Sequence, residues 1–236
     1  MLSIIVPALN EAAAIEATLQ AVQAWRGDGL EVIVVDGGSS DATMPLARAL
    51  ADHVITAPRG RAQQMNAGAA LASGSLLWFL HADTIVPKSA LGAILHAIPG
   101  GESLPPTVSG QGAFENMAWG RFDVTIAGRA AMLRVVAWMM NLRSRATGIA
   151  TGDQAMFMTR AAFAAVGGFP VQPLMEDIEM SRRLGRLVAP LCLRERVVTS
   201  GRRWEERGVW RTIFLMWRLR FAYFRGARAA DLARRY

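Results

Sequence analysis

Short apolar runs that alternate with Ala-rich segments constrain the fold of this chain more than any other feature of its sequence. Ser3–Pro7 is a short continuous apolar run, typical of a parallel strand that is covered on both faces, and Glu31–Asp36 and Leu76–Leu80 are the next expected strands. Residues 11–25 and 61–72 are among the helical segments expected beside them. Because repeated β-α units favour a parallel sheet with right-handed crossovers, the sequence predicts an α/β fold with a mostly parallel central sheet flanked by helices.

The alternating pattern changes after residue 98, where Pro and Gly residues over 99–112 predict a loop. The elements expected after it are strands over residues 119–126 and 155–158 and helices over residues 129–145, 176–187 and 209–225. These elements complete the first half and do not form an independent unit. We therefore expect one α/β domain over residues 1–205 and a helical tail over residues 206–236.

The composition fits a folded protein of one domain. The chain has 236 residues, of which 52% are hydrophobic and 19% charged, and this excludes a disordered chain. The single Cys192 excludes an intramolecular disulfide framework and fits a reducing compartment. The first seven residues do not resemble a signal peptide, and the apolar stretch Ala130–Leu142 is too short to span a bilayer. A cytoplasmic protein, soluble or peripheral on the membrane, is expected.

The net charge of +7 is concentrated at the C-terminal end. Residues 1–181 contain 11 Lys and Arg against 15 Asp and Glu, whereas residues 182–236 contain 15 Arg against 4 acidic residues. Nucleic acid, lipid headgroups or phosphate are the possible anionic partners of such a tail. A nucleic-acid partner is not expected, because no recognisable nucleic-acid module accompanies the arginines.

Polar residues follow three of the expected strands, at the edge where open α/β sheets bind ligands. They are Pro7–Glu11, Asp36–Asp41 and His81–Asp83. Asp36 precedes two glycines, which permit close backbone approach to a ligand. The alternative is that the polar residues cap helices, with Ser40 as the N-cap of the second helix.

Two further clusters carry charge at the expected start of a helix. Arg59 and Arg61 oppose the helix dipole and need a counter-charge, such as a diphosphate, unless they are solvated surface residues. Glu176 and Asp177 could supply a base for an incoming hydroxyl. Alternatively, they stabilise the helix N-terminus, with Glu179 paired to Arg183 one turn later.

In their order and spacing, these motifs resemble the family-2 glycosyltransferases of the GT-A fold. The similarity runs from Ser3 to about Trp204 and rests on residues 3–11, 35–41, 61–68, 81–83, 152–154 and 176–177. It is greatest to small single-domain bacterial members, some assigned to arsenosugar biosynthesis, and more distant to dolichyl-phosphate-mannose-type synthases. The resemblance implies a GT-A (Rossmann-like) fold. It also implies inverting transfer of one sugar from a UDP- or GDP-sugar to a hydroxyl acceptor.

The resemblance assigns the nucleotide-sugar to Pro7, Asn10, Glu11, Asp36, Arg61, Asn66 and Asp83. Asp83 matches the second acid of the DxD motif, which binds a divalent cation, Mn²⁺ or Mg²⁺, and bridges to the diphosphate. His81 replaces the first acid. An imidazole can bind Mn²⁺ but suits Mg²⁺ poorly, and the alternative is a structural histidine at a strand end.

The resemblance also assigns the acceptor side and the chemistry. Asp177, beside Glu176, matches the general base, and the acceptor side is assigned to Gly152, Asp153 and Gln154, with a turn as the alternative for Asp153. Processive relatives carry QxxRW where this chain has Gly201–Trp204. The missing motif indicates single-sugar transfer, while Arg202 and Arg203 can contact phosphate.

The last expected helix is amphipathic, with its aromatic residues on one face. Trp210, Ile213, Phe214, Trp217, Phe221 and Phe224 form that face. Such a helix, over residues 209–228, can lie on an anionic membrane and would suit a lipid-linked acceptor as well as a small-molecule one. The alternative is packing on the core or on a second subunit of a homodimer. A non-catalytic protein that binds membrane or nucleotide through this tail is the alternative function.

Overall fold

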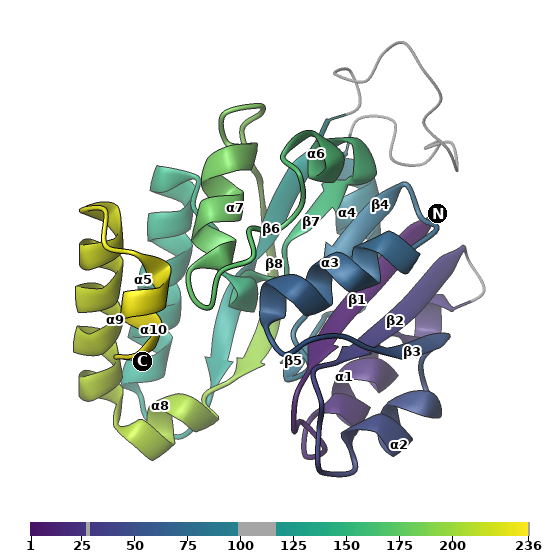
Figure 1. Ribbon diagram of the computed structural model, residues 1–236, viewed down its shortest axis with the longest axis horizontal. Helices are drawn as coiled ribbons and strands as arrows, with labels where there is room; N and C mark the ends of the chain where they lie inside the picture. Colours follow the sequence, from purple (N-terminus) through teal and green to yellow (C-terminus); the bar gives the residue numbers. More distant parts are fainter. Residues whose placement is uncertain (27–28, 99–116, 236) are drawn as a thin grey trace.

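An eight-stranded sheet organises the described part of the chain, which is residues 1–26, 29–98 and 117–235 of a computed structural model (Figure 1). The strands are β1 (Leu2–Ala8), β2 (Leu30–Asp36), β3 (His53–Thr56), β4 (Leu76–Phe79), β5 (Thr84–Ile85), β6 (Trp119–Ala127), β7 (Phe157–Thr159) and β8 (Leu191–Ser200). The helices are α1 (Ile15–Val22), α2 (Thr43–Arg48), α3 (Arg61–Leu71), α4 (Ala90–Ala97), α5 (Met132–Thr147), α6 (Arg160–Ala165), α7 (Glu176–Leu184), α8 (Arg202–Arg207), α9 (Val209–Phe224) and α10 (Ala229–Ala233). The strand order is β3-β2-β1-β4-β7-β6-β8-β5.

The first half of the sheet is parallel, as the sequence predicts. β1 pairs in parallel with β2 on one side and with β4 on the other, and β2 pairs in parallel with β3. Ile5 of β1 therefore lies opposite Ile33 and Phe79 in the two neighbouring strands. The carboxyl ends of β1, β2 and β4 meet at one edge, where the polar motifs were expected to converge.

The second half of the sheet is mixed, and here the expected mostly parallel arrangement is only partly correct. β7 pairs antiparallel with β4 and β6, and β5 pairs antiparallel with β8, while β6 and β8 run parallel. β8 was not expected. Its sequence alternates exposed charged residues with partly buried ones and so lacks a continuous apolar run.

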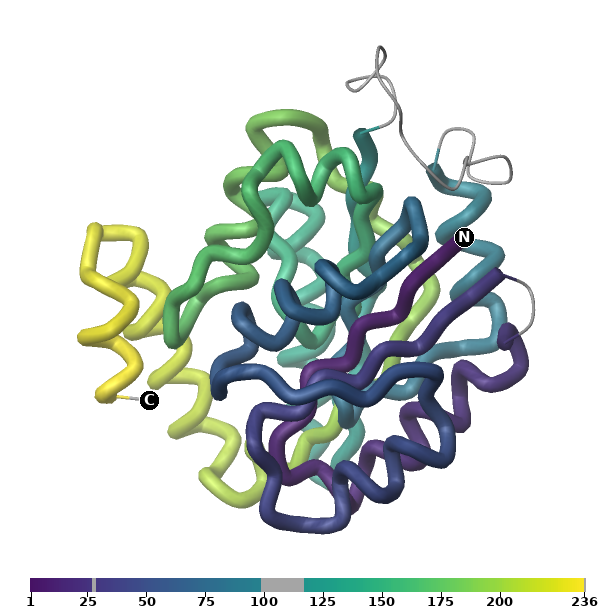
Figure 2. The backbone as a smooth tube through the Cα atoms, turned by 45° about the vertical axis from the view of Figure 1, so that its right-hand side comes forward, coloured from purple at the N-terminus to yellow at the C-terminus, as the bar shows by residue number. Residues whose placement is uncertain are grey.

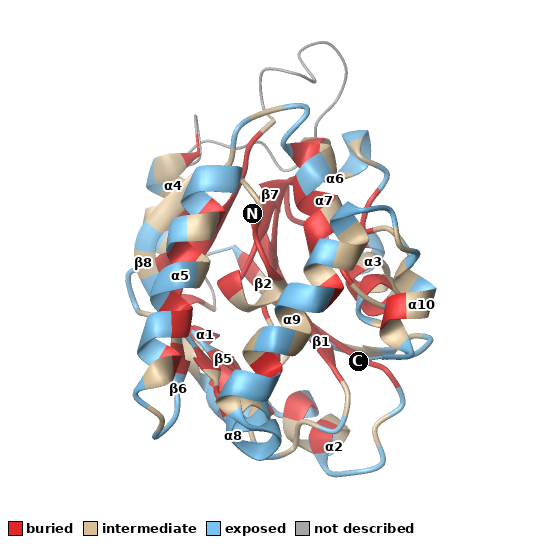
Figure 3. Cartoon of the chain, turned by 90° about the vertical axis from the view of Figure 1, so that its left-hand side faces the viewer, coloured by how far each residue is buried: buried red, intermediate tan, exposed pale blue. Residues whose placement is uncertain are grey.

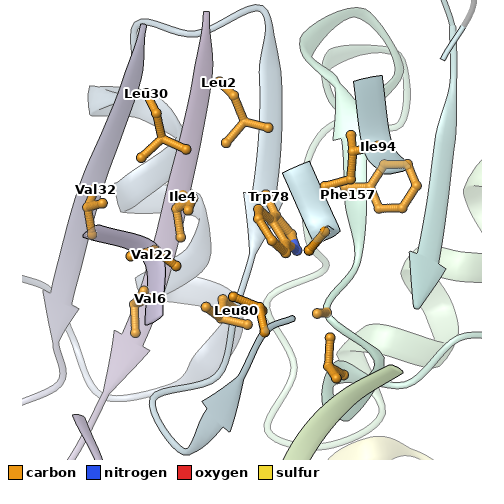
Figure 4. Close-up of a cluster of buried hydrophobic side chains, with 14 of the residues drawn as sticks. Leu2, Ile4, Val6, Val22, Leu30, Val32, Trp78, Leu80, Ile94 and Phe157 are labelled. Atoms are coloured by element: carbon orange, nitrogen blue, oxygen red, sulfur yellow. The ribbon is translucent and has the colours of Figure 1, made fainter. Parts of the chain in front are cut away.

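The two faces of the sheet bury different residues of the same strands. Ile4 and Val6 pack on the side of α1 and α4, together with Trp78 and Phe157 (Figure 4). Ile5 packs on the opposite side, against α3, α6 and α7. Because successive side chains point to opposite faces and both faces are covered, these strands carry apolar residues at consecutive positions.

A glycine lets α3 approach β1 closely. A Cβ atom placed on Gly68 would lie 2.5 Å from Cγ2 of Ile5 and 3.0 Å from Cγ2 of Val35. Because no such atom is present, the helix that begins at Arg61 lies directly over the strands whose ends carry the polar motifs.

The C-terminal helices lie on one side of the sheet, next to α5 and α7 (Figures 1 and 2). Leu219 of α9 and Leu232 of α10 are buried with Met175 and Ile178. The boundary expected between residues 205 and 206 falls within α8, and the division into domain and tail stays a prediction. None of the helices in the described ranges is both long and apolar enough to cross a membrane.

The structure differs from two expectations about helix ends, and a third expectation, about a loop, cannot be compared with it. Ser40 does not cap α2. That helix begins at Thr43, whose N–H donates to Oδ1 of Asp41 at 3.0 Å. The helix expected from Glu11 begins only at Ile15, after a turn. The loop expected over 99–112 lies outside the described residues.

Candidate active site

A cleft of about 680 Å³ opens beside the carboxyl ends of β1 and β4 and extends to α7, α8 and α9. The residues expected at the site that line this cleft are Pro7, Glu11, Arg61, His81, Asp83, Gly152, Asp153, Glu176, Asp177, Arg202 and Arg203. They come from segments far apart in the sequence. The fold thus brings most of the expected site residues into one cavity.

Asn10 and Asp36 do not line the cleft and instead shape the loops at its edge. The buried carboxylate of Asp36 accepts hydrogen bonds from the N–H groups of Gly38 and Ser39, both at 2.9 Å. Oδ1 of Asn10 accepts one from the N–H of Ser40 at 2.8 Å. These bonds fix the loop after β2 against the loop after β1.

Asn66 and Gln154 also lie away from the cleft lining. Nδ2 of Asn66 donates to the carbonyl of Phe169 at 2.8 Å, and its Oδ1 accepts from the Phe169 N–H at 2.9 Å. Gln154 is buried and its Oε1 accepts from the N–H of Thr151 at 3.2 Å. Both amides are used within the protein, which favours a structural role for them.

His81 packs against the segment assigned to the acceptor side. Its Nδ1 lies 3.3 Å from Oδ1 of Asp153, and its side chain is 11% exposed. A Cβ atom on Gly152 would lie 2.4 Å from Nε2 of His81, so only glycine permits this packing. The arrangement favours the interpretation of His81 as a residue that holds the 152–153 turn.

Asp83 is the residue best placed to share a metal ion with a diphosphate. It is partly exposed in the cleft, in the turn between β4 and β5. Within the described ranges, no three His, Cys, Asp or Glu side chains gather into a metal-binding cluster. One carboxylate oxygen still fits a Mg²⁺ or Mn²⁺ ion that takes its other ligands from phosphate and water.

Asp177 is fixed at the cleft wall by backbone donors. Its Oδ2 accepts from the N–H of Gly152 at 2.9 Å, and its Oδ1 accepts from the N–H of Ile178 at 2.8 Å. The carboxylate joins the first turn of α7 to the turn that packs on His81. The Glu179–Arg183 ion pair is also present, at 3.3 Å, so stabilisation of the helix and a place in the cleft coexist.

Glu176 differs from its neighbour in burial. Burial raises the pKa of the Glu176 carboxyl, and the charge of Asp177 raises it further, whereas Arg61 opposes the shift. Oε1 of Glu176 lies 3.9 Å from Nη1 of Arg61. Glu176 therefore supplies the counter-charge that an arginine at the start of α3 was expected to need.

Arginines form the positive side of the cleft. Nη2 of Arg202 lies 3.1 Å from Oε2 of Glu11, and this hydrogen bond and charge raise the pKa of Arg202. Burial and the charge of Arg61 lower the pKa of Arg203. An anion between Arg61 and Arg203 would relieve their mutual repulsion, so this side of the cleft suits a phosphate group.

The sequence interpretation missed two residues near the cleft, the buried Gln64 and the partly buried Arg143. Nε2 of Gln64 donates to the carbonyls of Ala8 and Val35, both at 2.8 Å, and so ties together the ends of β1 and β2. The sequence does contain a signal for this role of Gln64: it lies one turn after Arg61 in a helix whose alanines face the sheet.

Arg143 of α5 is the second such residue. Burial lowers its pKa while attraction to Asp177 raises it, and Nε and Nη2 have no hydrogen-bond partner within the described structure. Nothing in its sequence context distinguishes it from the neighbouring arginines.

Residues 3–163 match the family described as "Glycosyl transferase family 2". A "PGL/p-HBAD biosynthesis glycosyltransferase" of Mycobacterium tuberculosis is 37% identical over 90 residues, which cover 35% of each chain. "Probable glycosyltransferase YdaM" of Bacillus subtilis is 26% identical over 245 residues, which cover 95% of this chain and 54% of YdaM. The chain thus spans about a third to a half of these relatives.

The fold is similar to that of solved structures. The mannosyltransferase PcManGT from Pyrobaculum calidifontis, in complex with GDP-Man and Mn²⁺, superposes with a TM-score of 0.60 at 24% identity. The match covers 98% of this chain and 66% of that chain. These findings confirm the resemblance and the expected fold: the chain belongs to glycosyl transferase family 2 and has the GT-A fold.

Proposed function

We propose that this protein transfers one sugar from a nucleotide-diphosphate sugar to a hydroxyl acceptor, with inversion at the anomeric carbon. One observation carries the proposal: a single cleft is lined by Asp83, Asp177 and the arginines Arg61, Arg202 and Arg203. Sugar transfer needs a group that binds the diphosphate and a base for the acceptor hydroxyl, and the cleft contains candidates for both.

Asp83 and the arginines form the donor side. Asp83 would hold a divalent cation together with the diphosphate, and the cation would stabilise negative charge on that leaving group. Arg61 and Arg203, which repel each other in the free cleft, provide further positive charge for the same group. The Mn²⁺ and GDP-Man bound to PcManGT support this assignment.

Asp177 is the general base of the proposed reaction. It is partly exposed in the cleft, whereas Glu176 is buried, has a raised pKa and faces Arg61. The acceptor oxygen bonds to the anomeric carbon as the bond to the diphosphate oxygen breaks, and the acceptor proton passes to Asp177. Attack opposite the leaving group inverts the anomeric centre.

The substitution Asp177→Asn tests the assignment of the base. The expected result is loss of sugar transfer by about 100-fold or more, because the amide cannot take the proton, with donor affinity unchanged within about twofold. Nucleotide release measures turnover, and calorimetry measures donor binding. Glu179→Gln, on the same helix but paired with Arg183, is the matched control. An active Asp177→Asn variant would place the base elsewhere.

A further inference from the structure

A stripe of aromatic side chains runs along α9 and faces away from the protein. It consists of Trp210, Phe214, Trp217, Phe221 and Phe224, which are between 57% and 64% exposed. Their spacing alternates between four residues and three, which keeps all five on one side of the helix. The buried residues of α9, Thr212 and Leu219, lie on the opposite side. The helix does pack on the protein, but not through these five aromatic residues. Ile213, which was expected on the same face, instead packs with Leu133 and Val136 of α5.

α5 adds apolar surface next to this stripe. Its exposed residues Val135, Trp138, Met139 and Leu142 are between 44% and 62% exposed. α5 and α9 pack together through Leu133, Val136 and Ile213. Figure 3 shows both helices on the same side of the molecule, each with exposed surface turned outward. We call the nine exposed residues of the two helices the α5/α9 face; apolar patches of this kind mark interaction sites.

The two helices that form the α5/α9 face carry only positive charge, because neither contains an acidic residue. Arg134, Arg211 and Arg218 are exposed. Of the other arginines, Arg145 pairs with Asp123, Arg220 lines the cleft, and Arg143 is partly buried near Asp177. Basic helices with Trp and Phe on one face bind at the interface of anionic membranes. A symmetric dimer through this face would instead bring arginines together, because the same surface is used twice.

A basic cavity connects this face to the cleft. The cavity has a volume of about 700 Å³ and is lined by Arg203, Arg207, Arg211, Thr212, Phe214, Leu215, Met216, Arg218 and Arg235. Phe214 belongs also to the α5/α9 face. Arg203, Arg207, Thr212 and Met216 line both the cavity and the cleft. An anionic headgroup in the cavity would therefore lie between the aromatic face and the site of chemistry.

We propose that the α5/α9 face docks on an anionic lipid bilayer and that the arginine cavity receives a lipid headgroup there. The docking follows from the exposed aromatic residues and the arginines alone. That the docked lipid surface supplies the acceptor hydroxyl rests on the proposed function. In this arrangement α9 contacts the bilayer with one side and lines the cleft with the other, through Thr212, Met216 and Arg220.

Vesicle binding by the full chain tests the docking. Wild type is expected to co-sediment with phosphatidylglycerol-containing vesicles at least about tenfold more strongly than with phosphatidylcholine vesicles. Trp217→Glu combined with Phe221→Glu should reduce that binding by about tenfold or more, because both side chains would enter the interface. Leu71→Glu combined with Leu187→Glu changes exposed apolar residues elsewhere and should bind as wild type does.

The arginines are tested with the same vesicles. Arg211→Gln and Arg218→Gln should each weaken binding about fivefold, which corresponds to about 1 kcal/mol per arginine near an anionic surface. Equal binding by wild type and the Trp217/Phe221 variant, or no binding by wild type, would overturn the proposal. A wild-type dimer that these two substitutions convert to a monomer, without vesicle binding, would assign the face to a second copy.

Calorimetric measurement of donor binding without vesicles distinguishes a failure of the docking proposal from a failure of the proposed function. The Trp217/Phe221 variant should bind a nucleotide-sugar as wild type does, which also shows that it is folded. Failure of wild type to bind any donor would contradict the proposed function and leave the docking result intact. Vesicle binding without any transfer to lipid extracted from those vesicles or to lipid-linked acceptors would overturn only the acceptor assignment.

Discussion

At the scale of single residues, the two neighbouring acids at the start of α7 have different environments. The carboxylate of Asp177 is held by two backbone N–H groups, whereas the Glu176 carboxyl is buried beside that negative charge. Buried carboxyls favour the protonated form, and a nearby carboxylate strengthens the effect. Glu176 is therefore a buried part of the cleft wall, whereas Asp177 is held at the cleft surface by backbone hydrogen bonds, where the proposed reaction needs its base.

Glu176→Gln should reveal this burial as a pH dependence of stability. Because the folded-state pKa of Glu176 lies above the unfolded value of 4.5, its contribution to stability is fully present below pH 4.5. It is lost as the pH rises through the folded-state pKa. At pH 7 the glutamine variant should therefore be as stable as wild type or more stable, by about 1 kcal/mol.

Thermal unfolding of both proteins between about pH 4.5 and 8 measures the difference. The advantage of the variant should shrink toward the acid end. A wild type that is clearly the more stable protein at pH 7 would mean that the ion pair with Arg61 outweighs the cost of burial.

The sequence predicted which residues lie at the cleft better than it predicted which partner each of their side chains contacts. Asp83 and Asp177 follow from motifs whose order is specific to a family. Asn66 was assigned to the nucleotide, but its amide is used by Phe169, a residue 103 positions later in the chain. A polar residue near a strand end is compatible with a ligand contact and with a loop contact. Only the tertiary structure decides between them.

At the scale of elements, the contact between α3 and β1 positions Arg61, at the start of α3, in the lining of the cleft. Gly68→Ala should destabilise the protein by about 1–3 kcal/mol, because the new methyl group would lie 2.5 Å from Ile5 and force α3 away from the sheet. Chemical denaturation measures the free energy of unfolding.

Gly92→Ala is the matched control for this substitution. Gly92 lies in α4 with no atom within 4 Å of the added Cβ, so alanine there should stabilise the helix by about 0.5–1 kcal/mol. Equal effects of the two substitutions would contradict the close packing of α3 on β1.

Strands with a run of apolar residues could be predicted from the sequence, whereas β8 could not. β1, β2 and β4 are buried on both faces, so their sequences are mostly apolar. β8 is half exposed and contains Arg194, Glu195 and Arg196, which read as a charged loop. Its place beside β6 depends on a parallel pairing with a strand some seventy residues earlier, and no local pattern encodes that pairing.

At the scale of the whole molecule, the charge imbalance of the sequence becomes a local property of the cleft. The basic C-terminal segment supplies Arg202, Arg203, Arg207 and Arg220 to the cleft lining, opposite the carboxylates of the α/β body. The lining as a whole holds as many carboxylates as arginines, so the positive charge that suits an anionic group is local to the side that these arginines form. The C-terminal segment from Arg202 onward thus lines the cleft and also carries the α9 part of the α5/α9 face.

Calorimetric titration of wild type and Asp83→Asn with UDP- and GDP-sugars, with and without Mn²⁺, tests most directly whether this cleft binds a nucleotide-sugar. The Glu179→Gln variant is the control for a charge change outside the cleft. We expect one class of donor to bind wild type in the presence of the cation. Its affinity should fall about tenfold or more in Asp83→Asn or when Mn²⁺ is removed, because the diphosphate then loses its bridging ligand. No binding of any donor to wild type, or equal affinity for wild type and Asp83→Asn, would contradict the assignment of this cleft to a nucleotide-sugar.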